Sequence, residues 1–121
     1  MLRCLIVDDN ASFLDAAASL LEREGLAVVG VASTTDGALQ QVGELRPDVV
    51  LVDIMLGSES GFDLARRLAE VDGRMTVILV STHAGSDFAD LIAATPAAGF
   101  VPKSELSAAA VRELVSAGRG T

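Results

Sequence analysis

Short apolar runs recur five times along the chain, and a stretch with helical spacing separates each run from the next. Continuous apolar runs without polar alternation are typical of strands buried on both faces of a parallel sheet. Such strands are therefore predicted over the ranges 2–7, 27–32, 49–52, 76–80 and 99–101.

The intervening stretches repeat apolar residues every three or four positions, which predicts five helices. Gly25 ends the first helix, Pro47 the second and Pro96 the fourth, because glycine favours a helix C-terminus and proline cannot continue a helix. The third ends near Gly73, and glycines fray the fifth, so residues 117–121 are expected to form a loose tail. The residues that mark the helices in turn are Leu14, Ala17, Ala18 and Leu21; Ala38, Leu39, Val42 and Leu45; Gly61, Leu64, Ala65 and Leu68; Phe88, Leu91, Ile92 and Thr95; and Leu106, Ala110, Val111 and Leu114.

Strands that alternate with helices predict an α/β fold, in which right-handed crossovers build one parallel sheet with helices on both faces. The 121 residues suffice for a single domain, 1–121. Periodicity leaves the order of the strands open. In doubly wound sheets, however, ligands bind at the carboxyl ends of the strands. The polar residues at those ends are therefore the candidates for chemistry.

The charge of the chain narrows the classes of partner. Nine Lys and Arg residues against seventeen Asp and Glu give a net charge of −8, which argues against direct contact with nucleic acid or an anionic membrane. No apolar run approaches the ~18 residues of a membrane helix, and the N-terminus is not expected to be a signal peptide. Cys4, the only cysteine, is most simply a buried, inert thiol. We expect a cytoplasmic protein.

Acidic, hydroxyl and basic side chains stand at four of the predicted strand ends. They converge on one edge of the sheet if the first, third, fourth and fifth strands are neighbours. These residues are Asp8 and Asp9 after the first strand, Asp53 at the end of the third, Ser81 and Thr82 after the fourth, and Lys103 after the fifth.

Three carboxylates in one place repel one another unless a cation relieves the repulsion. Oxygen donors without a soft ligand suit Mg²⁺ or Mn²⁺, and Lys103 supplies a positive point charge. Such a site can hold a phosphoryl group, and a carboxylate can itself be the nucleophile that forms an aspartyl-phosphate. Taken singly, the residues have plainer interpretations: an aspartate pair favours a helix N-terminus, Ser81 can cap a helix, and Lys103 can be a solvated loop residue.

With these motifs together, the chain resembles a response-regulator receiver domain of the chemotaxis-receiver type, the phosphate-accepting partner in two-component signalling. The resemblance covers essentially the whole chain and implies a flavodoxin-like sheet with strand order 2-1-3-4-5. It implies that Asp53 is the phospho-acceptor and that Ser81 and Lys103 respond to the phosphoryl group. The metal ligands it implies are Asp8, Asp9, Asp53 and the backbone carbonyl of Met55.

Other positions fit the family less closely. Phe100 is similar to its aromatic switch but is equally well a buried core ring, and Thr82 stands where the family usually has a small residue. Gly57 replaces a usual proline, so the loop 57–61 is expected to be more flexible. Ser60 stands where the family often has an acid or amide before the next glycine, and the usual Lys-Pro order is replaced by Pro-Lys-Ser. A cis bond after Lys103 is therefore not expected.

The lifetime of a phospho-form is set in this family by two positions, here Met55 and His83. The Met55 side chain cannot orient an attacking water by a hydrogen bond, which favours a long-lived phospho-form. His83 can orient that water, shield the site, or be an exposed loop residue.

The resemblance implies a switch that takes a phosphoryl group from a sensor histidine kinase or a histidine phosphotransfer protein onto Asp53, with Mg²⁺. It implies a changed protein-binding face formed by the fourth helix, fifth strand and fifth helix, read by a downstream protein or a second copy of the chain. The domain then catalyses only its own phosphorylation and dephosphorylation. Three alternatives stay open: an interaction module that works without phosphorylation, the receiver half of a longer DNA-binding regulator, and a metal-dependent phosphatase.

Overall fold

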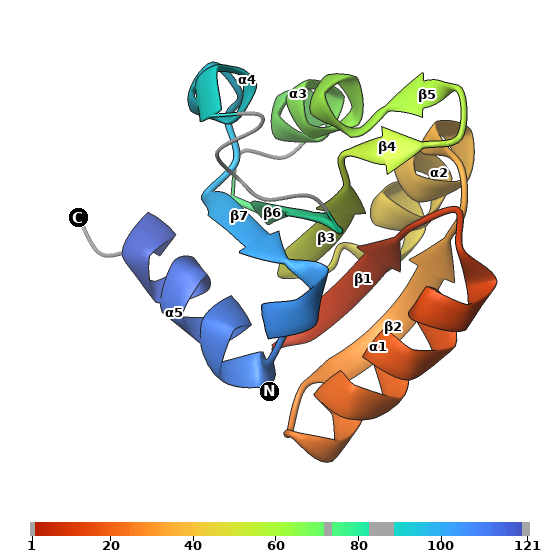
Figure 1. Ribbon diagram of the computed structural model, residues 1–121, viewed down its shortest axis with the longest axis vertical. Coiled ribbons are helices and arrows are strands. Elements are labelled where there is room, and N and C mark those ends of the chain that lie inside the picture. The colour runs from red at the N-terminus through yellow and green to blue at the C-terminus, as the bar shows by residue number, and fades with distance from the viewer. Residues whose placement is uncertain (1, 72–73, 83–88, 120–121) are drawn as a thin grey trace.

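The protein is described by a computed structural model that covers residues 2–71, 74–82 and 89–119. Five parallel strands form one sheet in the order β2-β1-β3-β6-β7 (Figure 1). Since β6 and β7 are the fourth and fifth of the long strands, this is the expected order 2-1-3-4-5. The strands are β1 (Arg3–Val7), β2 (Ala27–Ala32), β3 (Val49–Asp53), β6 (Thr76–Ser81) and β7 (Gly99–Pro102).

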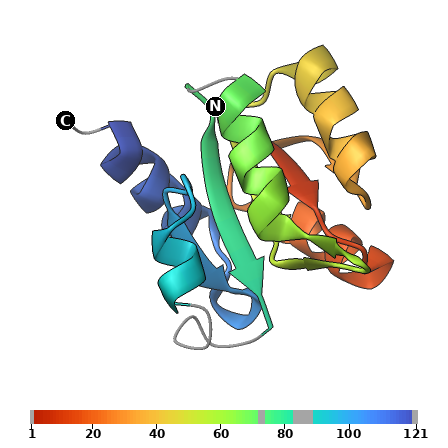
Figure 2. The ribbon, with the colours of Figure 1, turned by 90° about the horizontal axis from the view of Figure 1, so that it is seen from above.

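Helices cover both faces of the sheet, as expected for an α/β fold of the flavodoxin-like type. In Figures 1 and 2, α1 and α5 lie on one face, and α2, α3 and α4 lie on the other. Their bounds are α1 (Ala11–Arg23), α2 (Thr35–Leu45), α3 (Gly61–Val71), α4 (Ala89–Ala93) and α5 (Ala108–Arg119). None of the helices in the described residues is long and apolar enough to cross a membrane.

The core has two layers because successive side chains of a strand point to opposite faces of the sheet. Leu5 of β1 packs in the layer beneath α2 and α3, whereas Cys4 and Ile6 pack in the layer beneath α1 and α5. All five residues of β3 and all six of β6 are buried. The continuous apolar runs were therefore a sound signal for central strands that are covered on both faces.

Local capping sets where the helices begin and end. The side chain of Asn10 accepts a hydrogen bond from the backbone N–H of Phe13 at 3.1 Å and so caps α1. Thr34 caps α2 in the same way, through the N–H of Gly37 at 3.0 Å. At the other end of α2, Arg46 adopts a left-handed φ of 47° just before Pro47, which ends the helix as predicted.

The structure corrects the sequence interpretation in two places. The loop expected over 57–61 contains part of a hairpin, in which β4 (Met55–Leu56) pairs antiparallel with β5 (Glu59–Ser60). Gly57 makes the tight turn with a positive φ of 61°, which glycine adopts at no steric cost. The tail expected from residue 117 is also wrong at its start, because α5 continues to Arg119.

Candidate functional site

The sheet brings its polar strand ends to one edge. Asp8 directly follows β1, and its backbone N–H donates to the carbonyl of Ala32 at 3.0 Å, which extends the β1–β2 ladder by one bond. Asp53 is the last residue of β3 and stands opposite Val80 of β6. Lys103 begins a short 3₁₀ helix, η2 (Lys103–Glu105), directly after β7. The convergence predicted for this edge is therefore present.

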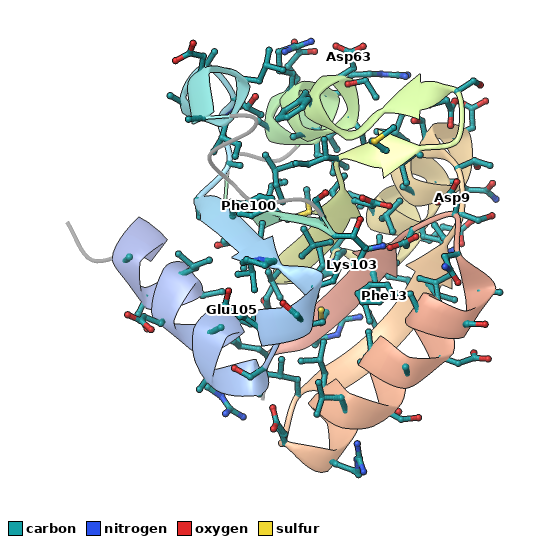
Figure 3. The ribbon with its side chains drawn as sticks, viewed as in Figure 1. Asp9, Phe13, Asp63, Phe100, Lys103 and Glu105 are labelled. Atoms are coloured by element: carbon teal, nitrogen blue, oxygen red, sulfur yellow. The ribbon has the colours of Figure 1, made fainter. Side chains whose placement is uncertain are left out.

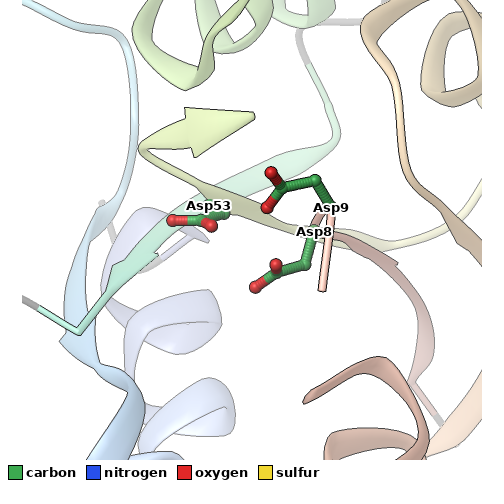
Figure 4. A group of neighbouring side chains, drawn as sticks. All are labelled: Asp8, Asp9 and Asp53. Atoms are coloured by element: carbon green, nitrogen blue, oxygen red, sulfur yellow. The ribbon is translucent and has the colours of Figure 1, made fainter. Parts of the chain in front are cut away.

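Three carboxylates form the centre of the site (Figure 4). One oxygen from each of Asp8, Asp9 and Asp53 lies within 4.8 Å of the others. Asp8 is fully buried and Asp53 is 7% exposed, whereas Asp9 is exposed. Oδ1 of Asp8 is held in place, because it accepts a hydrogen bond from the N–H of Asn10 at 2.9 Å.

Among the residues that the structure describes, a single ammonium group faces these acids. Lys103 is the only lysine in the sequence, and its side chain is 13% exposed. Its Nζ forms an ion pair with Oδ2 of Asp8 and lies 3.4 Å from Oδ2 of Asp53. Figure 3 shows this side chain reaching from the end of β7 toward the first turn of α1. One positive charge therefore compensates only part of the negative charge of three carboxylates.

The crowding of carboxylates changes the pKa of Asp53. Burial raises the pKa of Asp53 above its ordinary value, and the neighbouring charge of Asp8 raises it further. The N–H of Met55, 3.3 Å from Asp53 Oδ1, and the ammonium of Lys103 lower that pKa again but do not cancel the rise. Hard oxygen donors with surplus negative charge fit a divalent cation such as Mg²⁺, which would be held by Asp8, Asp9 and Asp53.

The remaining predicted residues take different places. Ser81 is the last residue of β6 and is 2% exposed, whereas Thr82 beside it is exposed. Phe100 of β7 is half-buried and packs against the core layer beneath α2 and α3, as a core ring does; whether it moves stays a prediction. The Met55 side chain is 53% exposed, and the ligand role of its carbonyl also stays a prediction.

Two predictions concern the loop that follows β6 and the bond after Lys103. His83 lies outside the described residues, so its role stays a prediction. The bond after Lys103 is trans, as expected, since the described residues contain no cis peptide.

Two residues next to the site were not recognised as site residues from the sequence. The N–H of Gly61, at the start of α3, donates to the carbonyl of Ile54 at 2.8 Å, and a Cβ on Gly61 would lie 2.0 Å from the carbonyl oxygen of Asp53. The ring of Phe13 lies beneath Lys103, with Nζ 4.2 Å from the ring centroid. A glycine in the segment after Asp53 was a usable signal, but nothing distinguishes Phe13 from an ordinary apolar helix residue.

A doubly wound sheet with this acidic pocket and lysine at its carboxyl edge is the arrangement of a signal receiver domain. A family profile described as "Response regulator receiver domain" matches residues 4–115, and the chain belongs to that family. It is thus a receiver domain of two-component signalling.

Named relatives agree with this assignment. The response regulator GacA of Pseudomonas viridiflava is 31% identical over 118 residues, which cover 97% of this chain and 53% of that protein. The DNA-binding response regulator MtrA of Mycolicibacterium paratuberculosis is 38% identical over 90 residues, which cover 74% of this chain and 38% of that protein. The chain thus spans about half the length of the first relative and less of the second.

A solved structure of similar fold is the two-component response regulator of the LuxR family from Aurantimonas sp. SI85-9A1. Its TM-score is 0.86 at 30% identity, and the match covers 99% of this chain and 86% of that one.

Proposed function

We propose that this receiver domain is a phosphorylation-dependent switch that accepts a phosphoryl group on Asp53 in the presence of Mg²⁺. The donor is a sensor histidine kinase or a histidine phosphotransfer protein. The observation that carries the proposal is the charge balance of the site: three carboxylates lie within 4.8 Å of one another and face one ammonium. Two negative charges are left for a divalent cation to neutralise.

The transfer is a displacement at phosphorus. A carboxylate oxygen of Asp53 forms the new O–P bond as the donor's N–P bond breaks, and the electron pair of that bond leaves with the imidazole nitrogen. A bound Mg²⁺ supplies charge stabilisation at the phosphoryl oxygens. Asp8 and Asp9 would hold the cation, and Lys103 would neutralise a further phosphoryl oxygen. The domain catalyses only its own phosphorylation and dephosphorylation, and is not an enzyme acting on a separate substrate.

The output of the switch is a changed protein-binding surface. Phosphorylation places about −2 of charge beside Ser81 and Lys103, and the surface that responds is formed by α4, β7 and α5. Leu91 of α4 is 52% exposed, which suits a contact with a downstream protein or with a second copy of the chain. A net charge of −8 argues against direct DNA binding by this domain, so a DNA-binding activity, as named for MtrA, would belong to a further domain.

In the deciding experiment, the protein is incubated with Mg²⁺ and a small acyl- or amidophosphate donor, and its mass is measured by intact-protein mass spectrometry. We expect one phosphoryl adduct on the wild type and none on Asp53→Asn. Asp15→Asn is the matched control, because Asp15 is an exposed aspartate of α1 outside the acidic pocket; this variant should carry the adduct.

The other outcomes identify the rival functions. Absence of an adduct with every donor overturns the proposal in favour of an interaction module that works without phosphorylation. Repeated turnover of an unrelated phosphate ester overturns it in favour of a phosphatase.

A further inference from the structure

The ammonium group of Lys103 contacts an aromatic ring as well as carboxylates. On one side, Nζ forms the ion pair with Asp8 Oδ2. On another side, it lies over the face of Phe13, 4.2 Å from the ring centroid. A cation within about 6 Å of a ring centroid is attracted by the negative face of the ring. Figure 3 shows Phe13 rising from the first turn of α1 to meet the lysine.

The backbone fixes the ring at this place through the same aspartate. Asp8 Oδ1 accepts a hydrogen bond from the N–H of Asn10 at 2.9 Å. Asn10 Oδ1 accepts in turn from the N–H of Phe13 at 3.1 Å. Lys103 therefore contacts Asp8, Asp8 contacts Asn10, Asn10 contacts Phe13, and the Phe13 ring contacts Lys103. The aspartate that pairs with the lysine also orders the turn that carries the ring.

We propose that Phe13 is a positioning residue, whose aromatic face holds the Lys103 ammonium at the phosphoryl-accepting edge. This inference rests on the proposed function for its kinetic consequence, but not for the placement of the lysine itself. A lysine side chain has several rotatable bonds and a strongly hydrated head, so an ion pair alone fixes it poorly. The ring removes the lysine conformers that turn away from the acids toward solvent.

Phe13 also has a structural role that must be separated from positioning. Its side chain is partly buried and packs against the core layer beneath α1 and α5. Loss of apolar volume and loss of the aromatic face therefore have to be tested by different variants. Phe13→Leu keeps an apolar side chain but removes the ring, whereas Phe13→Tyr keeps the ring. Phe62→Leu is the matched control, because Phe62 is buried in the opposite core layer.

The first measurement is the NMR signal of the Lys103 ε-methylene protons in the metal-free protein. Lys103 is the only lysine, so the assignment is unambiguous. Protons over a ring face are shifted upfield. We expect this shift in the wild type, in Phe13→Tyr and in Phe62→Leu, and its loss in Phe13→Leu. Phe13→Met serves as a second ring-free variant if Phe13→Leu does not fold.

The second measurement is the rate of phosphorylation by a small acyl-phosphate donor. A cation–π contact that is partly open to solvent corresponds to about a two- to fivefold change in rate. We expect Phe13→Leu to be slower by that factor and Phe13→Tyr to recover the wild-type rate.

The two measurements distinguish failure of the proposed function from failure of the role proposed for Phe13. An unphosphorylated wild type overturns the proposed function, while the ring-dependent shift would still support placement of Lys103 by Phe13. Equal rates for wild type, Phe13→Leu and Phe13→Tyr overturn the positioning role. An unshifted lysine signal in the wild type, or one that Phe62→Leu also abolishes, overturns the placement itself.

Discussion

Gly61 is the position where a single added methyl group has the largest consequence that the structure allows to be worked out. It begins α3 directly beside the end of β3. A Cβ placed on Gly61 would lie 2.0 Å from the carbonyl oxygen of Asp53 and 2.8 Å from the Cα of Ile54. Ordinary contact between heavy atoms lies at roughly 3.5 Å, so Gly61→Ala requires a backbone movement of more than about 1 Å.

Neither side of this contact yields easily. The Asp53–Ile54 segment is bound on its other side, because the N–H of Ile54 donates to the carbonyl of Val80 at 3.0 Å. The Gly61 N–H is itself bonded to Ile54. Overpacking of this kind costs about 1–3 kcal/mol and occasionally more, and losing a buried backbone bond adds about 1 kcal/mol. Less a helix-propensity gain of at most about 1 kcal/mol, we expect Gly61→Ala to lower the free energy of unfolding by about 1–3 kcal/mol.

Gly43 offers the same chemical change without the close contact. It lies in α2, is exposed, and a Cβ there would meet nothing within 4 Å. Gly43→Ala should therefore raise the free energy of unfolding by about 0.5–1 kcal/mol, because alanine loses less backbone entropy in a helix. Since the chain has no Trp and no Tyr, urea unfolding is best followed by far-UV circular dichroism. With m of about 1–3 kcal/mol per M, the two midpoints should move in opposite directions by readily measured amounts.

A stability of Gly61→Ala within about 0.5 kcal/mol of the wild type, alongside the expected gain in Gly43→Ala, would contradict the close approach of α3 to the end of β3. Equal destabilisation of both variants would contradict it as well, because the added methyl group of Gly43→Ala meets nothing within 4 Å. The same Gly61→Ala protein should also accept a phosphoryl group more slowly, because the movement displaces Asp53.

Four further predictions follow from the environment of particular side chains. Because the pKa of Asp53 is raised, the native state holds the proton more tightly than the unfolded chain, so the free energy of unfolding should fall as pH rises from 3.8 through the native pKa. In urea titrations of the metal-free protein, Asp53→Asn should flatten this pH dependence, and an unchanged slope would contradict the prediction. Mg²⁺ at a hundred times its Kd should stabilise the wild type by about 2.7 kcal/mol and Asp9→Asn much less, measured by thermal unfolding; equal gains would place the cation elsewhere. Cys4 is fully buried, and burial raises its pKa to about 12. An aromatic disulfide reagent should therefore modify the native protein at least about a thousandfold more slowly than the unfolded chain; rapid modification of the native protein would contradict this. Met55→Asn should shorten the half-life of a phospho-form by orienting water, with Met55→Leu as the unshortened control; a half-life no shorter than that of the wild type would rule out the long-lived form.

The elements were predictable because burial imposes a simple pattern on them. A central strand of a parallel sheet is covered on both faces and therefore carries a continuous apolar run, and every residue of β3 and β6 is buried. The strand ends then indicated the site, because aspartate is disfavoured inside strands and becomes conspicuous at residue 53. Strand order could not be read from periodicity and came from the family resemblance.

The remaining features depend on contacts that no local pattern encodes. The hairpin of β4 and β5 pairs only two residues on each side, too few to show alternation. A contact with a residue far away in the sequence stabilises the hairpin, because Glu59 Oε1 accepts a hydrogen bond from the N–H of Thr35 at 3.0 Å. The meeting of Phe13 with Lys103 joins the first helix to the end of the last strand, and only the assembled sheet brings those two segments together.

The position of the Lys103 ammonium depends on the balance of negative charge between Asp8 and Asp53. Lys103 is the only lysine of a chain with a net charge of −8, and in the resting structure it is closer to Asp8 than to Asp53. In the proposed function, aspartyl phosphorylation would replace about −1 with about −2 at Asp53, which would shift the balance of attraction on the ammonium from Asp8 toward the phosphoryl group. A lysine drawn toward Asp53 would weaken its ion pair with Asp8, and Asp8 also orders the Asn10 turn at the start of α1. The start of α1 should therefore respond to phosphorylation together with the end of β7.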